Sequence, residues 1–301
     1  MADRPVPTPV ASAALGLAGV AATWGAIGLI VREVDLPAVA IVAARCWLGA
    51  AGIGVGLLIR WIRTGEGRPK VTHPWLLLAA GVVQAAHWLL LVAAQQRAPI
   101  GTVLLVMYLS PVLVAVLATR FLDERVTATT KLALALAVGG LALLVRPEHG
   151  AIGGVLLAAG AGVTFAVLTV ISKVAVTDVG GTWLAFSNLT VAGLAVAPFA
   201  LMAGWGPPQA SWAWLLALGL GMTALLVPVY LGLLDRLPAT TASVLLYFEP
   251  LSALVLGWLV LGEHASPATL AGGGLIVGAG ILVLRQGGTT AEAEVLVHVP
   301  G

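Results

Sequence analysis

Two charged side chains lie deep inside long apolar stretches, where a charge is costly. Glu249 is about ten residues into the apolar block 239–261, which would place it ~15 Å deep in a bilayer. A charge at that depth costs roughly 2.5–3.5 kcal/mol on insertion scales, so this carboxyl must be paired, hydrated or protonated. Loss of hydration favours the neutral carboxyl, which makes Glu249 a candidate for proton coupling. A protonated glutamic acid bonded to a neighbouring helix is the structural alternative.

Arg45 is the second such residue. It lies about eight residues from one end of the apolar block 37–59, roughly 12 Å deep. Its guanidinium can bind a substrate carboxylate through two hydrogen bonds, or it can neutralise Glu249. Alternatively, the long side chain reaches the membrane surface or ties two helices together.

A polar stripe follows one face of the block 74–95. Gln84, His87, Trp88 and Gln95 recur at spacings of 3, 4 and 11 residues from Gln84, which places them on one side of a helix. Such a stripe faces protein or water, so we expect a cavity wall that offers hydrogen bonds and an aromatic surface. Hydrogen bonds between helices alone are the alternative. His87 can titrate near neutrality, but a histidine here is more typical of a satisfied structural partner.

Other polar and aromatic side chains inside apolar blocks are candidates to bind a substrate at the same site: Trp24, Tyr108, Thr164, Asn188, Tyr230 and Tyr247. Two of them, Tyr108 and Tyr247, each precede a proline by three residues. Because proline removes a helix hydrogen bond, we expect a kink beside each tyrosine.

The elements that position these residues follow from composition. The chain of 301 residues is 60% hydrophobic and 9% charged, with a mean hydropathy of +1.04. Soluble domains contain roughly 25% charged residues, so this is an all-α integral membrane protein by composition. The net charge of +2 and scattered basic residues indicate no nucleic-acid partner. The single cysteine, Cys46, allows no intramolecular disulfide and no cysteine-based metal site; no metal or cofactor is expected.

Apolar blocks of roughly 18–24 residues, long enough to cross a hydrocarbon core of about 30 Å, divide the sequence. Their continuous apolar character favours helices over barrel strands, and the first block reads as a span rather than a cleaved signal peptide. Ten such blocks are predicted, at 11–31, 37–59, 74–95, 100–119, 129–146, 151–172, 181–203, 211–233, 239–261 and 267–285.

The distribution of Lys and Arg predicts the orientation. If the N-terminus is cytoplasmic, most basic residues between blocks lie inside, and Arg32, Arg97 and Arg146 alone lie outside. This bias agrees with the positive-inside rule, and it favours an even number of helices with both termini in the cytoplasm.

An internal repeat is the most specific pattern. Residues 97–146 align without a gap to residues 236–285. The aligned pairs are Pro99 with Pro238, Thr102 with Thr241, Tyr108 with Tyr247, Pro111 with Pro250, Leu122 with Leu261, Glu124 with Glu263, and Gly139 with Gly278. Similar hydrophobicity alone would not align prolines, tyrosines and glutamates together, so the chain is a duplication.

Five helices in each copy is an odd number, so the second copy must be inverted in the membrane. The cytoplasmic Arg120, Arg125 and Lys131 of the first copy accordingly correspond to Leu259, His264 and Leu270 of the second. We predict a tail at 1–10, repeats at 11–147 and 148–286, and a cytoplasmic tail at 287–301. Inverted repeats place a substrate site at their interface near the midplane, which predicts transport.

From about Val10 to Arg285 the sequence resembles the EamA-type transporters of the drug/metabolite transporter superfamily. The resemblance rests on these motifs: Trp24-Gly25, Arg45, Tyr108-Leu109-Ser110-Pro111, Tyr247-Phe248-Glu249-Pro250, Leu122-Asp123-Glu124 and Leu261-Gly262-Glu263. It implies ten helices around a central cavity and export of amino acids, threonine/homoserine and aromatic amino acids among them. Glu124 and Glu263 end their helices at the water boundary, so we expect structural or gating roles for them.

We therefore expect a secondary active exporter of amino acids or related small metabolites, working by alternating access in the inner or plasma membrane. Efflux of other small amphipathic compounds and channel-like uniport remain alternatives. An enzyme would need clustered carboxylates or a nucleophile with a base, and the spans hold one acidic residue. Sugar-phosphate transport would need several cavity cations, whereas the spans offer Arg45. The oligomeric state stays open, with a monomer allowed.

Overall fold

The computed structural model describes residues 9–98, 100–144, 152–204, 206, 209–261 and 267–297, and these residues form helices and connecting loops without strands. Within these ranges, seven helical stretches are long and apolar enough to cross a membrane. They are 10–31, 38–64, 74–95, 152–179, 181–202, 212–235 and 239–256, and shorter apolar helices cover 110–121, 128–143 and 270–283.

The helices of the first half of the chain are α1 (Pro9–Trp24), α2 (Ile27–Arg32), α3 (Ala38–Thr64), α4 (Pro74–Gln95), α5 (Ile100–Met107), α6 (Ser110–Phe121) and α7 (Ala128–Leu144). Those of the second half are α8 (Ile152–Val179), α9 (Gly181–Met202), the short η1 (Gln209–Ser211), α10 (Trp212–Leu216), the π-helix η2 (Ala217–Leu225), α11 (Leu226–Asp235), α12 (Ala239–Leu245), α13 (Phe248–Leu261) and α14 (Pro267–Val297).

Each predicted apolar block contains helix, but several helices outlast their block. The predicted blocks end where the first charged residues occur. A helix can continue into water beyond those charges, until a residue such as glycine leaves the helical conformation. Helix α3 ends at Gly65 and α8 at Gly180, both with positive φ angles (69° and 77°) that favour glycine. Helix α14 likewise runs past Arg285 to Val297, into the segment expected to be a tail.

Two of the blocks are broken in the middle. Residues 108–109 separate α5 from α6, and residues 246–247 separate α12 from α13. Each break lies just before the expected proline, Pro111 or Pro250, which cannot donate a backbone hydrogen bond. The two breaks meet, because the hydroxyl of Tyr247 donates to the carbonyl oxygen of Tyr108 at 2.8 Å and their rings lie 5.7 Å apart. A carbonyl beside one break is thereby satisfied from the other.

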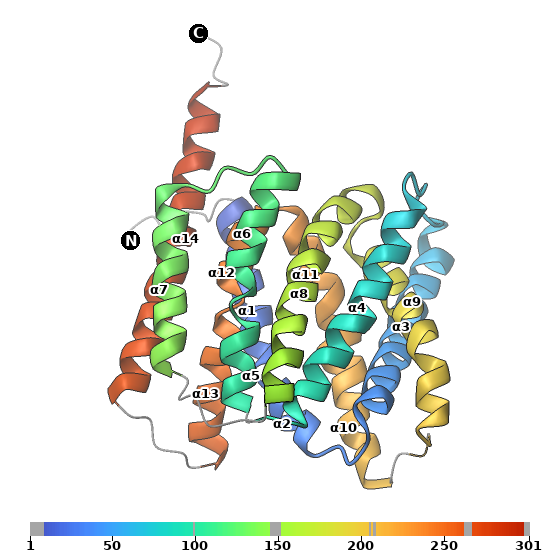
Figure 1. Cartoon of the computed structure of the whole chain (residues 1–301). Coiled ribbons are helices and arrows are strands. Elements are labelled where there is room, and N and C mark those ends of the chain that lie inside the picture. Colours follow the sequence, from blue (N-terminus) through green and yellow to red (C-terminus); the bar gives the residue numbers. More distant parts are fainter. Residues whose placement is uncertain are drawn as a thin grey trace, which may run out of the picture.

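Glycines let helices approach closely. A Cβ atom at Gly81 of α4 would overlap the Val191 side chain and lie 3.2 Å from the carbonyl oxygen of Asn188, both in α9. One at Gly140 of α7 would lie 2.7 Å from the carbonyl oxygen of Gly272 in α14. Small residues at crossings are typical of membrane helices, which gain little from burying apolar surface. Helices α7 and α14 pack together at one edge of the bundle (Figure 1).

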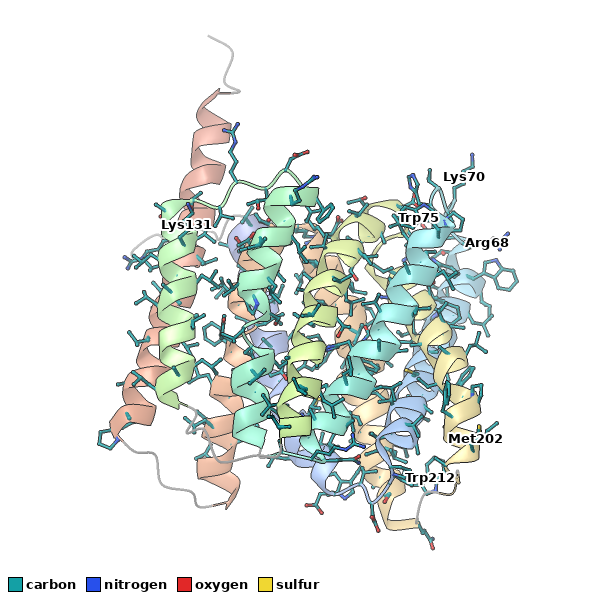
Figure 2. The ribbon with its side chains drawn as sticks, in the orientation of Figure 1. Arg68, Lys70, Trp75, Lys131, Met202 and Trp212 are labelled. Carbon is teal, nitrogen blue, oxygen red and sulfur yellow. The ribbon has the colours of Figure 1, made fainter. Side chains whose placement is uncertain are left out.

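Both ends of the described chain lie at the same end of the bundle, since α1 begins and α14 finishes at the top of the view (Figure 1). Arg68, Lys70 and Lys131 lie at this end, which we call the basic end (Figure 2). Met202 and Trp212 lie at the opposite, far end (Figure 2).

At the basic end, Glu124 joins the loop after α6 to the start of α12. Its carboxylate accepts hydrogen bonds from the backbone N–H groups of Ala239 (2.6 Å) and Thr240 (3.2 Å) and from the Thr240 hydroxyl (2.9 Å). These donors belong to the first turn of α12, where backbone N–H groups lack helical partners and a negative charge is favoured. Nearby, the ammonium of Lys173 donates to the carbonyl oxygens of Leu234 and Asp235, both at 2.8 Å.

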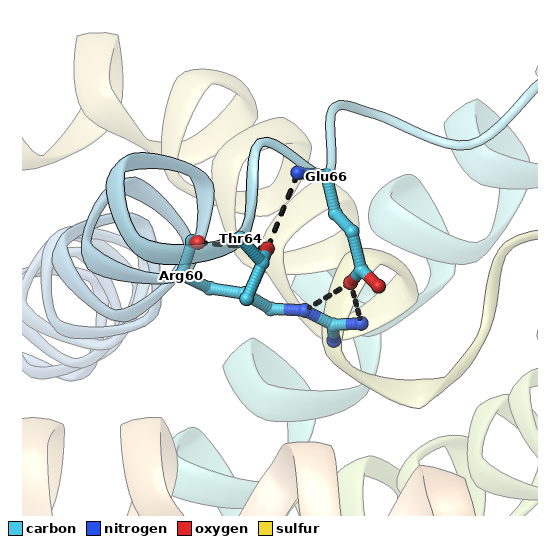
Figure 3. A network of polar contacts seen from close by, with 3 residues as sticks. All are labelled: Arg60, Thr64 and Glu66. Carbon is cyan, nitrogen blue, oxygen red and sulfur yellow. Dashed lines mark hydrogen bonds and ion pairs between the residues drawn. The ribbon is translucent and has the colours of Figure 1, made fainter.

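A second carboxylate at the basic end makes a solvated contact. Arg60, near the end of α3, forms an ion pair with Glu66, just beyond that end, and the Thr64 hydroxyl hydrogen-bonds to the backbone of both residues (Figure 3). The two charged side chains are 60% and 58% exposed. Solvent-exposed pairs contribute about 0–1 kcal/mol, so this contact shapes the loop rather than the bundle.

We predict that Glu124→Ala lowers the free energy of unfolding by about 1–3 kcal/mol, because it leaves N–H donors of α12 without their charged acceptor. Glu66→Ala should change it by less than about 1 kcal/mol. Thermal denaturation of the two detergent-solubilised variants beside the unaltered protein measures the difference. Equal destabilisation by both substitutions would contradict a stabilising role for the hydrogen bonds between Glu124 and α12.

Candidate functional site

A cavity of about 130 Å³ lies inside the bundle. A water molecule occupies roughly 10–15 Å³ on such a measure, so there is room for several waters or for one small metabolite. Among the described residues, η1, α6, α7, α10, α12 and α14 contribute none to the wall. The polar and aromatic lining residues are Trp24, Arg45, Gln84, His87, Trp88, Gln95, Tyr108, Phe165, Thr169, Ser172, Asn188, Tyr230 and Glu249.

Arg45 of α3 is held firmly at the wall. Its Nε donates to the hydroxyl of Thr223 at 2.8 Å, and its guanidinium lies 3.8 Å from the centre of the Trp88 ring. These contacts fix the plane of the guanidinium and occupy its Nε–H donor. The two terminal nitrogens remain at the outer edge, which is the pair that binds a carboxylate bidentately.

The contact to Thr223 depends on the π-helix η2. Thr223 donates its own hydroxyl to the carbonyl oxygen of Leu218, five residues earlier, so its oxygen is free to accept from Arg45. The indole N–H of Trp24 donates to the carbonyl oxygen of Met222 at 3.0 Å. This one irregular turn therefore anchors two cavity residues, and π-helical turns are frequent at functional sites. Sequence analysis missed Thr223, because the apolar segment around it carries no sign of a π-helix.

Glu249 reaches the cavity from the first turn of α13, directly after the break at residues 246–247. A helix N-terminus favours a carboxylate, and Tyr108 lines the same cavity as this one. Arg45 and Glu249 share the cavity and influence each other electrostatically, yet they form no direct ion pair. Neutralisation of Glu249 by Arg45, one of the alternatives expected from the sequence, therefore does not occur through a direct ion pair.

The polar stripe of α4 lies along the cavity. Gln84, His87, Trp88 and Gln95 all line it, and the first three are buried. His87 Nδ1 lies 3.0 Å from the carbonyl oxygen of Ala161 and, since a carbonyl can only accept, carries the hydrogen. This bond ties α4 to α8, and His87 lines the cavity as well.

An aromatic wall faces these polar groups. The rings of Trp24 and Tyr230 lie 5.3 Å apart at a tilt of 52°, and both residues line the cavity. Asn188 of α9 lines it as well and is 2% exposed.

Two predicted site residues lie elsewhere. Thr164 bonds back to its own helix, at Gly160 (2.8 Å) and Ala161 (3.0 Å), and does not line the cavity. Tyr247 is fully buried at the helix breaks, where its hydroxyl serves the Tyr108 carbonyl. The repeat predicted equivalent positions for Tyr108 and Tyr247. Instead, the hydroxyl of Tyr247 donates to a backbone carbonyl, and only Tyr108 of the two lines the cavity.

Helix α8 also supplies lining residues that the prediction did not include. Phe165, Thr169 and Ser172 line the cavity, and their spacings of 4 and 3 residues place them on one helix face. That spacing was readable in the sequence.

The arrangement places the guanidinium of Arg45 and the carboxyl of Glu249 at separate points of a mostly apolar cavity. Such a cavity suits a small solute that carries both charges. No group of three or more His, Cys, Asp or Glu that could hold a metal ion occurs within the described ranges.

Comparison with known proteins gives relatives of nearly full length. An uncharacterised transporter of Archaeoglobus fulgidus is 28% identical over 87% of this chain and 92% of its own. The threonine/homoserine exporter RhtA of Escherichia coli is 29% identical over 81% and 83%. The pseudopaline exporter CntI of Pseudomonas aeruginosa is 27% identical over 87% and 92%. A solved crystal structure shares the fold, with a TM-score of 0.78 and 21% identity over 90% of this chain and 97% of that one.

The EamA-like transporter family matches two segments, residues 11–146 and 152–285, which together include all of the cavity residues named above. The apolar helices, the cavity with its few polar side chains and this match agree with the resemblance in the sequence motifs. The chain is an integral membrane transporter, not an enzyme, and belongs to the EamA-like transporter family.

Proposed function

We propose that this protein exports amino acids or closely related zwitterionic metabolites across the cell membrane by secondary active transport. The observation that carries the proposal is the placement of Arg45 and Glu249 in one cavity without an ion pair between them. A zwitterion would give each of them a partner. The relatives named as exporters of threonine/homoserine and of pseudopaline support export of small solutes.

The proposed architecture is ten membrane helices in two inverted repeats, residues 11–147 and 148–286, with both termini in the cytoplasm. The double match of the family supports two related halves. The location of Arg68, Lys70 and Lys131 at the end where α1 begins supports a cytoplasmic basic end (Figure 2).

The cavity extends toward the far end of the bundle. Its lining includes Val31, near the end of α2, and Gln95, the last residue of α4. At the basic end, the contacts of Glu124 and Lys173 join the helices instead. We therefore propose that these contacts close the basic end in this arrangement. Transport then requires these contacts to open while the far end closes, which is alternating access between inverted repeats.

Labelling of introduced cysteines tests the topology. Cys46 is the single cysteine and is fully buried, so unaltered protein should react little with a membrane-impermeant maleimide. In intact cells, Trp212→Cys should be labelled from outside, and Arg68→Cys should be labelled only after permeabilisation. Labelling of both positions from one side would overturn the proposed arrangement.

Arg45→Lys should raise the KM for amino acids about tenfold in liposomes, because lysine cannot bind a carboxylate bidentately or keep the stacking on Trp88. The measurement is counterflow of a panel of labelled amino acids in liposomes. Arg60→Lys, a matched change outside the cavity, should leave KM unaltered. Undiminished affinity in Arg45→Lys would refute its carboxylate role, and linear, unsaturable flux without counterflow would favour a channel.

Glu249→Gln should leave the protein folded and remove the pH dependence of transport, since glutamine keeps the shape but cannot exchange a proton. Uptake with and without an imposed pH gradient measures this, with Glu66→Gln as the control at an exposed carboxylate. A gradient response that persists in Glu249→Gln would rule out the coupling role.

A further inference from the structure

The connection between α3 and α4, at the basic end, carries cations that no carboxylate of the protein neutralises. Its one carboxylate, Glu66, is engaged in the ion pair with Arg60. Three further cations are exposed and form no ion pair within the residues that the structure describes: Arg63, Arg68 and Lys70. We call these three residues the loop cations. Together with Arg60 they make four cations within eleven residues of the chain.

Hydrogen bonds fix both ends of this connection. Helix α3 ends at Gly65, whose N–H donates to the carbonyl oxygen of Trp61 at 2.8 Å. At the start of α4, a carboxylate oxygen of Asp178 accepts from the backbone N–H groups of Thr72 (2.8 Å) and His73 (3.1 Å). The carboxylate that α8 contributes here is thus engaged with backbone donors, and the loop cations keep their charge available to another molecule.

Large apolar side chains flank the loop cations. Trp61 and Ile62, in the last turn of α3, are 55% and 68% exposed, and Trp75 in the first turn of α4 is 62% exposed. Arg68, Lys70 and Trp75 lie at one corner of the basic end (Figure 2). Tryptophan is enriched where a membrane meets water, because its ring suits the depth of the headgroups. A soluble anion would gain nothing from these side chains, so the combination favours a lipid.

The length of α3 indicates how far the loop cations lie from the hydrocarbon. The apolar block of this helix ends at Ile59, and the helix continues to Thr64, which adds ~8 Å at 1.5 Å per residue. The headgroup region on each side of a bilayer is about 5–8 Å thick. The last turn of α3 therefore reaches the height of the lipid phosphates rather than bulk water.

We propose that the connection between α3 and α4 binds the headgroups of anionic phospholipids through the loop cations. Lys and Arg clustered beside a membrane helix attract anionic lipids, and each cation adds to the attraction. Arginine also suits a phosphodiester in geometry, because its guanidinium can donate two hydrogen bonds to one phosphate. The proposal concerns the lipid around the protein and is independent of the solute that the protein carries.

Energy transfer to labelled lipids in liposomes tests this proposal. Cys46 is buried, so a donor fluorophore can be attached selectively to Val71→Cys, at an uncharged and 41% exposed position of the connection. Phosphatidylglycerol and phosphatidylcholine with the same fluorescent acyl chain are the acceptors, in separate preparations of otherwise neutral lipid. The acceptor is present in both leaflets, so the orientation of the protein does not affect the comparison.

We expect transfer that corresponds to about a threefold local excess of phosphatidylglycerol over phosphatidylcholine. Most of this excess should disappear in about 0.5 M salt, which screens exposed charges. Substitution of all three loop cations by glutamine should bring the ratio close to one. The matched control removes the same charge from another connection at the basic end, by Arg120→Gln, Arg125→Gln and Lys131→Gln together, and should keep the excess.

Three results would overturn the proposal. The first is equal transfer to the two lipids in the protein with its loop cations intact. The second is an excess of phosphatidylglycerol that persists without the loop cations. The third is an equal loss of the excess in both triple variants, because the charge of the whole basic end would then act and not this connection. None of these results bears on transport, which is measured separately by counterflow.

Discussion

Inside the hydrocarbon of a bilayer every backbone N–H and C=O must find its partner within the protein, and this requirement organises the structure. Unbroken helices meet it by themselves, but the cavity lies where two of them are interrupted. There the hydroxyl of Tyr247 satisfies the carbonyl of Tyr108. The same interruption starts α13 in the middle of the bundle and so delivers Glu249, with a helix N-terminus behind it. A helix can be interrupted at this depth because the Tyr108 carbonyl beside the break accepts a hydrogen bond from Tyr247.

The remaining polar groups are held by a few long-range bonds rather than by a polar core. Arg45 is bonded to Thr223 and Trp24 to the Met222 carbonyl, so the π-helix η2 fixes both the charge and an aromatic wall. His87 joins α4 to α8. Each bond joins segments far apart in the sequence, and each removes a rotational freedom that a bound solute would otherwise have to restrict. The cavity is therefore shaped before a solute enters.

Length, hydrophobicity and charge located the helices, because the bilayer imposes one length on every crossing. They could not locate helix ends beyond the bilayer, which depend on glycine conformations at Gly65 and Gly180. Within the site, Glu249 and Arg45 stood out because charge is costly in lipid. Thr164 and Tyr247 could not be placed, since their hydroxyls can turn to the backbone or to the cavity. Thr223 was invisible because nothing in an apolar sequence marks a π-helix.

The crossing at Gly81 has a consequence for the shape of the cavity. What positions Asn188 there is the absence of a side chain on the opposing helix. Even one methyl group at that point would wedge α4 and α9 apart and withdraw the amide from the wall. The position of a cavity side chain thus depends on a residue outside the cavity lining, so a change in helix packing can alter the cavity while its polar side chains stay the same.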